Sequence, residues 1–178
     1  MKRWWVVPVL ASLLLAAPSQ AWAGEDEWQL GLDLFGSVTT LGGAQGGAGA
    51  GIHASYGFAP AWSVVLSTRY RLVAPKTTAT GVRLPARHLT GITAGVYFAI
   101  DVMRLVPFLH AGLGAYMVYD DVEGVRFSPG AEAGLSFDYA LSRRINLGVD
   151  VIRVHLLRTD GVFWTPMDFG VRLTYVWF

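Results

Sequence analysis

The sequence has no cysteine, almost no lysine and no apolar run long enough for a transmembrane helix. Because none of its 178 residues is Cys, disulfide bonds and thiolate chemistry are excluded. The longest apolar run, Trp4 to Ala17, has 14 residues, short of the roughly 18 that a membrane-spanning helix needs. The net charge of +1 becomes −1 without Lys2 and Arg3, so the chain has no excess of positive charge and no nucleic-acid partner is expected.

The first 23 residues have the pattern of a secretory signal peptide. A basic pair precedes the apolar run, Pro18 breaks it, and Ala21-Trp22-Ala23 matches a small-x-small cleavage site. We expect residues 1–23 to be cleaved and residues 24–178 to form one domain. A retained N-terminal anchor is the alternative.

The rest of the chain alternates apolar with small or polar residues. In SPGAEAGLSFDY and INLGVDV, residues 128–139 and 145–151, the period is two, which predicts strands. The link ALSRR is too short for a crossover helix, so the pair is an antiparallel hairpin. Eight such segments predict strands near residues 28–40, 47–58, 62–72, 87–100, 106–119, 128–139, 145–151 and 166–178.

The polar face of these strands indicates which side is inside. A soluble barrel would expose many Lys and Glu, whereas the only lysine after residue 23 is Lys76 and the polar face is mostly Gly, Ser and Thr. Such a face suits a confined lumen. The apolar face ends in an expected aromatic girdle, as membrane interfaces favour: Trp28, Trp62, Tyr139, Tyr175 and Trp177. The sequence therefore predicts an all-β, eight-stranded antiparallel up-and-down transmembrane β-barrel with a polar, filled lumen.

Large side chains are expected to fill this lumen beside many glycines, because an eight-stranded barrel has room only for side chains. They are Asp33, His53, Arg69, Arg71, Tyr97, His110, Tyr116, Glu132, Asp138, Asp150 and Arg172. Phe35 interrupts the polar face of the first strand. Arg153 and His155 are expected to have left the hydrocarbon region, next to a loop over 156–165.

Six of these residues are predicted to form a lumen charge cluster: Asp33, Asp150, Arg172, Arg69, Arg71 and Glu132. Counting from the ends of their strands places Arg172 between the carboxylates of Asp33 and Asp150. The same count pairs Arg69 with Glu132 across the lumen. The glycines and the charges together argue against an open general porin.

The chain resembles the small eight-stranded outer-membrane proteins of the OmpA, OmpX and OmpW type. The resemblance covers residues 24–178 and depends on VPFLHAGLGAYMV, SPGAEAGLSFDYALSRRINLGVDV and the closing DFGVRLTYVWF. It implies a bacterial outer-membrane location, contact with outer-membrane lipids and lipopolysaccharide, and recognition of the C-terminal strand by the barrel-assembly machinery. Short links on one side and long loops on the other predict that both termini are periplasmic. Phe178 departs from the usual pattern, because its alternation places it on the face opposite to Trp177.

Three classes of function are compatible with such a barrel. The favoured one is a non-enzymatic structural or surface-interaction protein. The second is an OmpW-like conduit or binder for small apolar molecules, in which Phe163 and Trp164 line the entry or, more simply, anchor the interface. The third is a lipid A-modifying enzyme, since His53 and Ser55 share a face as in His-x-Ser deacylases. The acidic residue that those enzymes place further on is missing, and position 65 is Val.

No cofactor or metal is expected. His88, His110 and His155 lie on separate strands without metal-ligand spacing. Three acidic residues of the loop over 120–127 are more simply solvated charge than a calcium site: Asp120, Asp121 and Glu123. Three basic residues are candidates for lipopolysaccharide phosphates: Lys76, Arg83 and Arg87.

Overall fold

The computed structural model describes residues 26–39, 44–78, 80–100, 105–121, 124–159 and 162–177. The expected signal peptide, Glu123 and Phe178 lie outside these residues, and so do the predictions made for them.

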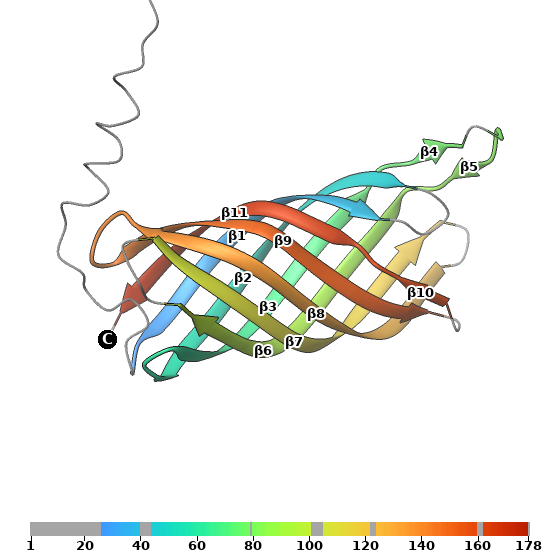
Figure 1. The fold of residues 1–178 in the computed structure, drawn as a ribbon. Coiled ribbons are helices and arrows are strands. Elements are labelled where there is room, and N and C mark those ends of the chain that lie inside the picture. Colours follow the sequence, from blue (N-terminus) through green and yellow to red (C-terminus); the bar gives the residue numbers. More distant parts are fainter. Residues whose placement is uncertain are drawn as a thin grey trace, which may run out of the picture.

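Eight long strands form a closed barrel (Figure 1). They are β1 (Trp28–Thr39), β2 (Gln45–Ala59), β3 (Trp62–Val73), β6 (Arg87–Ala99), β7 (Leu105–Asp120), β8 (Gly124–Ala140), β9 (Ile145–Thr159) and β11 (Met167–Trp177). Each pairs antiparallel with the next, and β11 pairs with β1. Three short strands are β4 (Lys76–Thr77), β5 (Arg83–Leu84) and β10 (Val162–Trp164). The predicted eight-stranded antiparallel up-and-down barrel is confirmed.

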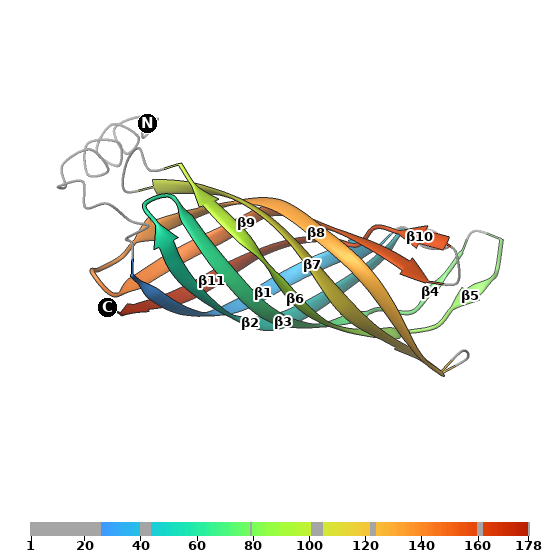
Figure 2. The same cartoon turned by 90° about the horizontal axis from the view of Figure 1, so that it is seen from below.

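The register shows a stagger of ten residues around the barrel. Following hydrogen-bonded partners from Trp28 on β1 through the seven other long strands leads back to β1 at Val38. Closure with such a stagger requires tilted strands, and Figure 2 shows them crossing the barrel obliquely. Because the barrel closes, the backbone groups of every long strand find partners on both sides, as a bilayer demands.

The two ends of the barrel differ. At one end, the turn end, β1 begins, β11 ends, and short turns such as residues 60–61 and 141–144 connect the strands (Figure 1). At the other, the hairpin end, the β4–β5 hairpin and β10 extend from the barrel (Figures 1 and 2).

Strands continue into three segments that we predicted to be loops at the hairpin end. β2 begins at Gln45, within the Gly-rich residues 42–49, where we expected a loop before the strand near 47–58. β9 runs to Thr159 before β10 pairs with it. Asp120 ends β7 and pairs with Gly124 at the start of β8, so the acidic loop is mostly strand. Gln45 and Asp120 lie on the lumen face of an alternation that continues, whereas Arg158 on β9 lies on the outer face.

A β-bulge interrupts β9. Its partners on both β8 and β11 shift by one residue between Asp150 and Arg153, so β9 has one more residue here than either neighbour. Even-numbered side chains point inward before the bulge, and odd-numbered ones after it. Arg153 and His155, each 1% exposed, therefore lie in the lumen on a strand that continues, and not next to a loop as predicted.

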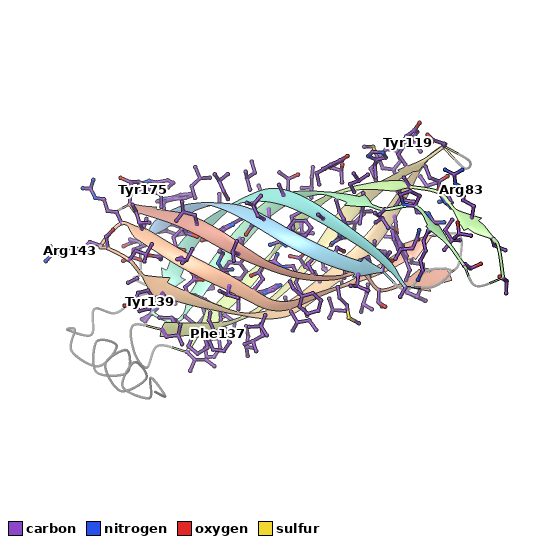
Figure 3. All side chains as sticks on the ribbon, turned by 90° about the horizontal axis from the view of Figure 1, so that it is seen from above. Arg83, Tyr119, Phe137, Tyr139, Arg143 and Tyr175 are labelled. Carbon is purple, nitrogen blue, oxygen red and sulfur yellow. The ribbon has the colours of Figure 1, made fainter. Side chains whose placement is uncertain are left out.

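Apolar side chains cover the outside of the barrel, for example Leu34 and Leu113, which are 63% and 72% exposed. The residues of the expected girdle lie at the turn end, where Figure 3 labels Tyr139 and Tyr175. Trp28, Trp62, Tyr175 and Trp177 are exposed there, and Tyr139 is half-buried. No described residue belongs to a helix that could span a membrane.

Candidate functional site

Eleven charged or imidazole side chains form one connected cluster inside the barrel, which we call the lumen network. Its members are Asp33, His53, Arg69, Arg71, Glu132, Asp138, Asp150, Arg153, His155, Asp168 and Arg172. All are nearly completely buried. Five carboxylates meet four guanidinium groups and two imidazoles. Buried charges are tolerated only when they are paired in this way.

Arg69 and Arg71 reach into the lumen from β3 and share the carboxylate of Asp168 on β11. Arg71 Nη2 donates to Asp168 Oδ2 at 2.6 Å, and Arg69 Nη1 lies 3.6 Å from the same oxygen. Arg69 Nη2 also donates to Asp150 Oδ2 at 3.0 Å and lies 3.5 Å from Asp33 Oδ1. These contacts connect β3 to β1, β9 and β11 across the lumen.

Arg172 binds two carboxylates, one of which was predicted. Its Nη1 donates to Asp150 Oδ1 at 3.3 Å, and its Nε donates to Asp138 Oδ1 at 2.9 Å. Asp33 is the direct register partner of Arg172, but its carboxylate binds residues of β2 and β3 instead. The predicted Asp33 contact is wrong because Gly148, across from Arg172, leaves room for the guanidinium to reach β8.

Arg153 connects Glu132 to the network. Its Nη1 donates to Glu132 Oε1 at 3.3 Å, and its Nη2 donates to the Tyr97 hydroxyl at 3.4 Å. Glu132 Oε1 also accepts from Thr93 Oγ1 at 3.1 Å. The predicted pair of Arg69 with Glu132 is wrong, since the bulge supplies Glu132 with a nearer partner.

His155 lies between a hydroxyl and a carboxylate. The Tyr116 hydroxyl is 3.1 Å from its Nδ1, and Asp168 Oδ2 is 2.9 Å from its Nε2. Asp168 was not among the predicted lumen residues, although it has the same parity as Arg172 on the last strand. The alternation was therefore sufficient to find it.

Aromatic rings lie against three of the guanidinium groups of the network. Phe35, which interrupts the polar face of β1, lies 5.0 Å from the Arg69 guanidinium carbon and 5.7 Å from that of Arg71. The Arg172 guanidinium carbon is 5.7 Å from the Tyr97 ring. The electron-rich ring faces attract these cations, so Phe35 belongs to the filling of the lumen.

Glycines make room for the largest lumen side chains from the facing strand. Gly91 pairs with Tyr116, and a Cβ added to Gly91 would lie 2.6 Å from the tyrosine ring. Gly148 pairs with Arg172, and a Cβ there would lie 2.5 Å from Arg172 Cγ. Any larger residue at either position would collide with the filling of the lumen.

Two apolar clusters lie in the lumen on either side of the network. The cluster toward the turn end consists of Val65, Tyr97, Ala99, Val106 and Phe108. The cluster toward the hairpin end consists of Leu89, Tyr116, Val118, Leu157 and Trp164. Trp164 is 3% exposed. The two roles that we considered for it, lining an entry or anchoring the membrane interface, are therefore both wrong. Phe163, its neighbour, is exposed.

A small cavity remains between Arg71, Tyr116 and Glu132. Its volume of about 10 Å³ accommodates about one water molecule. Arg71 Nη1 and Glu132 Oε2, which line it, have no hydrogen-bond partner among the described residues.

His53 and Ser55 face the lumen and are each 3% exposed. His53 Nδ1 lies 3.2 Å from Asp33 Oδ2, so the imidazole is oriented by the lumen network on the face opposite to lipid. Val65 belongs to the lumen as well. Within the part of the chain that the structure describes, no three His, Asp or Glu side chains could hold a metal ion.

The charges at the hairpin end are partly paired. Asp120 is 1% exposed, and its Oδ2 lies 3.1 Å from Arg126 Nη2 and 3.6 Å from Arg87 Nε. The prediction that Asp120 is a solvated loop charge is therefore wrong. Lys76 Nζ donates to the Ala44 carbonyl at 2.6 Å and is exposed. Arg83 is also exposed, and Figure 3 shows it at this end of the barrel.

A closed barrel of eight tilted strands, apolar outside and charged inside, is the fold of the small eight-stranded outer-membrane β-barrels of the OmpA, OmpX and OmpW type. Neisserial surface protein A is similar, with a TM-score of 0.70 over 85% of this chain and 99% of that one, at 16% identity. Ail, the attachment invasion locus protein of Yersinia pestis, gives 0.53 over 86% and 100%, at 16% identity. OprG of Pseudomonas aeruginosa gives 0.53 over 87% and 98%, also at 16% identity.

The chain matches no protein-family model and no curated protein. At the identities given, the solved structures establish the fold alone, so a function has to be argued from the lumen and the surface.

Proposed function

We propose that the chain is an integral outer-membrane protein with a structural or surface-interaction role, and that it neither catalyses a reaction nor conducts solutes. The lumen carries this proposal. Its charges bind one another between two apolar clusters, and the cavity among them has the volume of about one water. A lumen filled in this way supports a barrel that does not conduct solutes.

We infer the orientation of the barrel in the membrane from the difference between its two ends. The turn end faces the periplasm with both termini, where the barrel-assembly machinery recognises the C-terminal strand β11. The hairpin end, with its longer excursions, faces outward among lipopolysaccharide molecules. Residues 1–23 serve as the signal peptide for export. Short periplasmic turns and longer outer loops are usual for such barrels.

Two measurements on protein expressed from the full sequence test the proposal. In cell fractionation, the protein is expected in the outer-membrane fraction. On a gel, it is expected to migrate differently before and after boiling. A helical circular-dichroism spectrum, or a monomer that stays soluble without detergent, contradicts a membrane barrel.

Planar-bilayer conductance then tests the closed lumen. The purified barrel is expected to give no stable channel. A comparator is the double variant Tyr116→Ala/Trp164→Ala, which removes two rings of the hairpin-end cluster and is expected to raise the conductance. A stable channel in the unchanged protein contradicts the proposal and favours the conduit.

A further inference from the structure

A groove crosses the outer surface of the barrel from β9 to β3, with a volume of about 580 Å³. Two rows of outward side chains on β11, β1 and β2 form its walls, and the members of each row are register partners. The first wall is Leu173, Leu32 and Ile52, and the second is Val171, Leu34 and Ala50. Four steps between strands of about 4.8 Å make the groove roughly 19 Å long. It is long and mostly apolar, which suits a hydrocarbon chain.

The groove leads into a polar patch on the same outer surface. Thr68 and Tyr70 continue its two walls on β3, where they pair with Ile52 and Ala50. His88 follows on β6, and the Tyr70 hydroxyl lies 2.6 Å from its Nδ1. The hydroxyls and the imidazole belong to the outward face, although polar groups facing hydrocarbon are costly unless they find partners.

Counting along the strands places this patch near the outer edge of the apolar band. Tyr70 lies eight residues beyond Trp62 at the turn end, which is about 20 Å along the barrel axis for strands tilted by about 40°. His88 lies ten residues before Phe98, the partner of Trp62, or about 25 Å by the same count. The apolar band of such barrels is about 25 Å tall.

We propose that the groove and the patch together bind one lipid A molecule of the outer leaflet. One acyl chain lies between the two walls, and the ester and hydroxyl groups of the head bind Tyr70 and His88. With the Tyr70 hydroxyl as donor to Nδ1, the proton of His88 is on Nε2 and is donated to a head-group oxygen. The inference depends on the proposed function, because the outward orientation of the hairpin end places the patch in the outer leaflet.

Charge complementarity favours lipid A over an uncharged amphiphile. The exposed ammonium of Lys76 follows the end of β3, and its Nζ donates to the carbonyl of Ala44 beside the start of β2. It therefore lies beyond the two strands that carry the end of the groove, where a lipid A phosphate extends toward water. A Lys ammonium binds phosphate as a point charge.

Native mass spectrometry of the protein purified in mild detergent from cells that make lipid A tests the proposal. The unchanged protein is expected to retain one lipid A molecule. Ala50→Phe fills the groove and His88→Leu removes the head-group donor, and each is expected to lose most of it. The control is Ala111→Phe, an equal change on the outer face of β7, outside the groove, which is expected to retain lipid A.

Equal retention by Ala50→Phe and Ala111→Phe overturns the lipid site. Retention of phosphatidylethanolamine in place of lipid A also overturns it, because the groove is then a phospholipid-binding site. So does a cross-linked dimer that Ala50→Phe abolishes without an effect on lipid, because the groove is then an interface between copies of the chain. All variants are first checked for heat-modifiable migration. If the unchanged protein does not show heat-modifiable migration, the proposed function fails. If it does, the retention of lipid A tests the lipid site alone.

Discussion

Asp150 and Arg153 lie three residues apart on β9, yet both side chains point into the lumen, with Arg153 Nη2 3.5 Å from Asp150 Oδ2. In a regular strand, residues three apart point to opposite faces. The contact exists because the bulge adds one residue between them. The bulge therefore supplies Arg153 and His155 to the lumen network, where they bind Glu132 and Asp168.

Arg153→Met is expected to destabilise the barrel by about 3–5 kcal/mol, because it leaves the buried carboxylate of Glu132 without its guanidinium partner. Arg158→Met is the control on the same strand, since Arg158 is exposed, and its effect is expected to stay within about 0.5 kcal/mol. Denaturant midpoints of the two variants in detergent micelles measure the difference. Equal midpoints would show that Arg153 does not face the lumen.

Arg172→Ala is expected to lower the free energy of unfolding far more than Arg83→Ala on the exposed β5. The Arg172 guanidinium binds Asp138 and Asp150. Its loss leaves the buried carboxylate of Asp138 without a guanidinium partner, although Asp150 keeps Arg69, whereas Arg83 is exposed. A double-mutant cycle with Asp138→Ala is expected to give a coupling energy within the range of about 0.5–3 kcal/mol seen for neighbours. Additive effects of the two substitutions would mean that the pair does not form.

Gly148→Ala is expected to destabilise the barrel by about 1–3 kcal/mol, the usual cost of overpacking. Its Cβ would collide with Asp138 Oδ1 and lie 2.5 Å from Arg172 Cγ, so the salt bridge would have to separate. Gly46→Ala is the matched control, because nothing lies within 4 Å of a Cβ at that position. Thermal unfolding of both variants tests the difference, and equal melting temperatures would be inconsistent with the packing across β8, β9 and β11.

His53→Ala is expected to leave lipid A unchanged in cells that overexpress the protein. The imidazole binds Asp33 inside the barrel and is 3% exposed, so it does not meet the bilayer. Mass spectrometry of extracted lipid A is the measurement. Deacylated lipid A that disappears on mutation would restore the enzyme hypothesis.

The sequence was sufficient for the fold and for the side of most lumen residues, because alternation and closure are local rules repeated in eight strands. The same rule did not find Arg153 and His155, which we expected beyond the hydrocarbon region next to a loop. A bulge arises from pairing with both neighbours, and a regular count along β9 continues past Asp150 without a sign of it.

The partners of the charges were harder to predict than their side. Counting heights along straight strands brought Asp33 to Arg172 and Glu132 to Arg69. In the closed barrel, Asp33 instead binds His53 and Arg69. Arg172 binds Asp138 and Asp150, and Glu132 binds Arg153. Reach across the lumen, as from Arg69 to Asp150, depends on the closed barrel as a whole. No spacing in the sequence contains that information.

The central claim is that the lumen is filled by side chains, two of which the β9 bulge turns inward. The most direct test is a scan of single spin-labelled cysteines along β9 in lipid bilayers, which is possible because the chain has no cysteine of its own. Spin labels at residues 145–158 report accessibility to oxygen dissolved in lipid. The structure predicts high accessibility at residues 145, 147, 149 and 151 and low accessibility at residues 146, 148 and 150, then a change of phase that leaves residues 153, 155 and 157 protected. Unbroken alternation from residue 145 to residue 158, with Arg153 and His155 on the lipid side, would contradict the account.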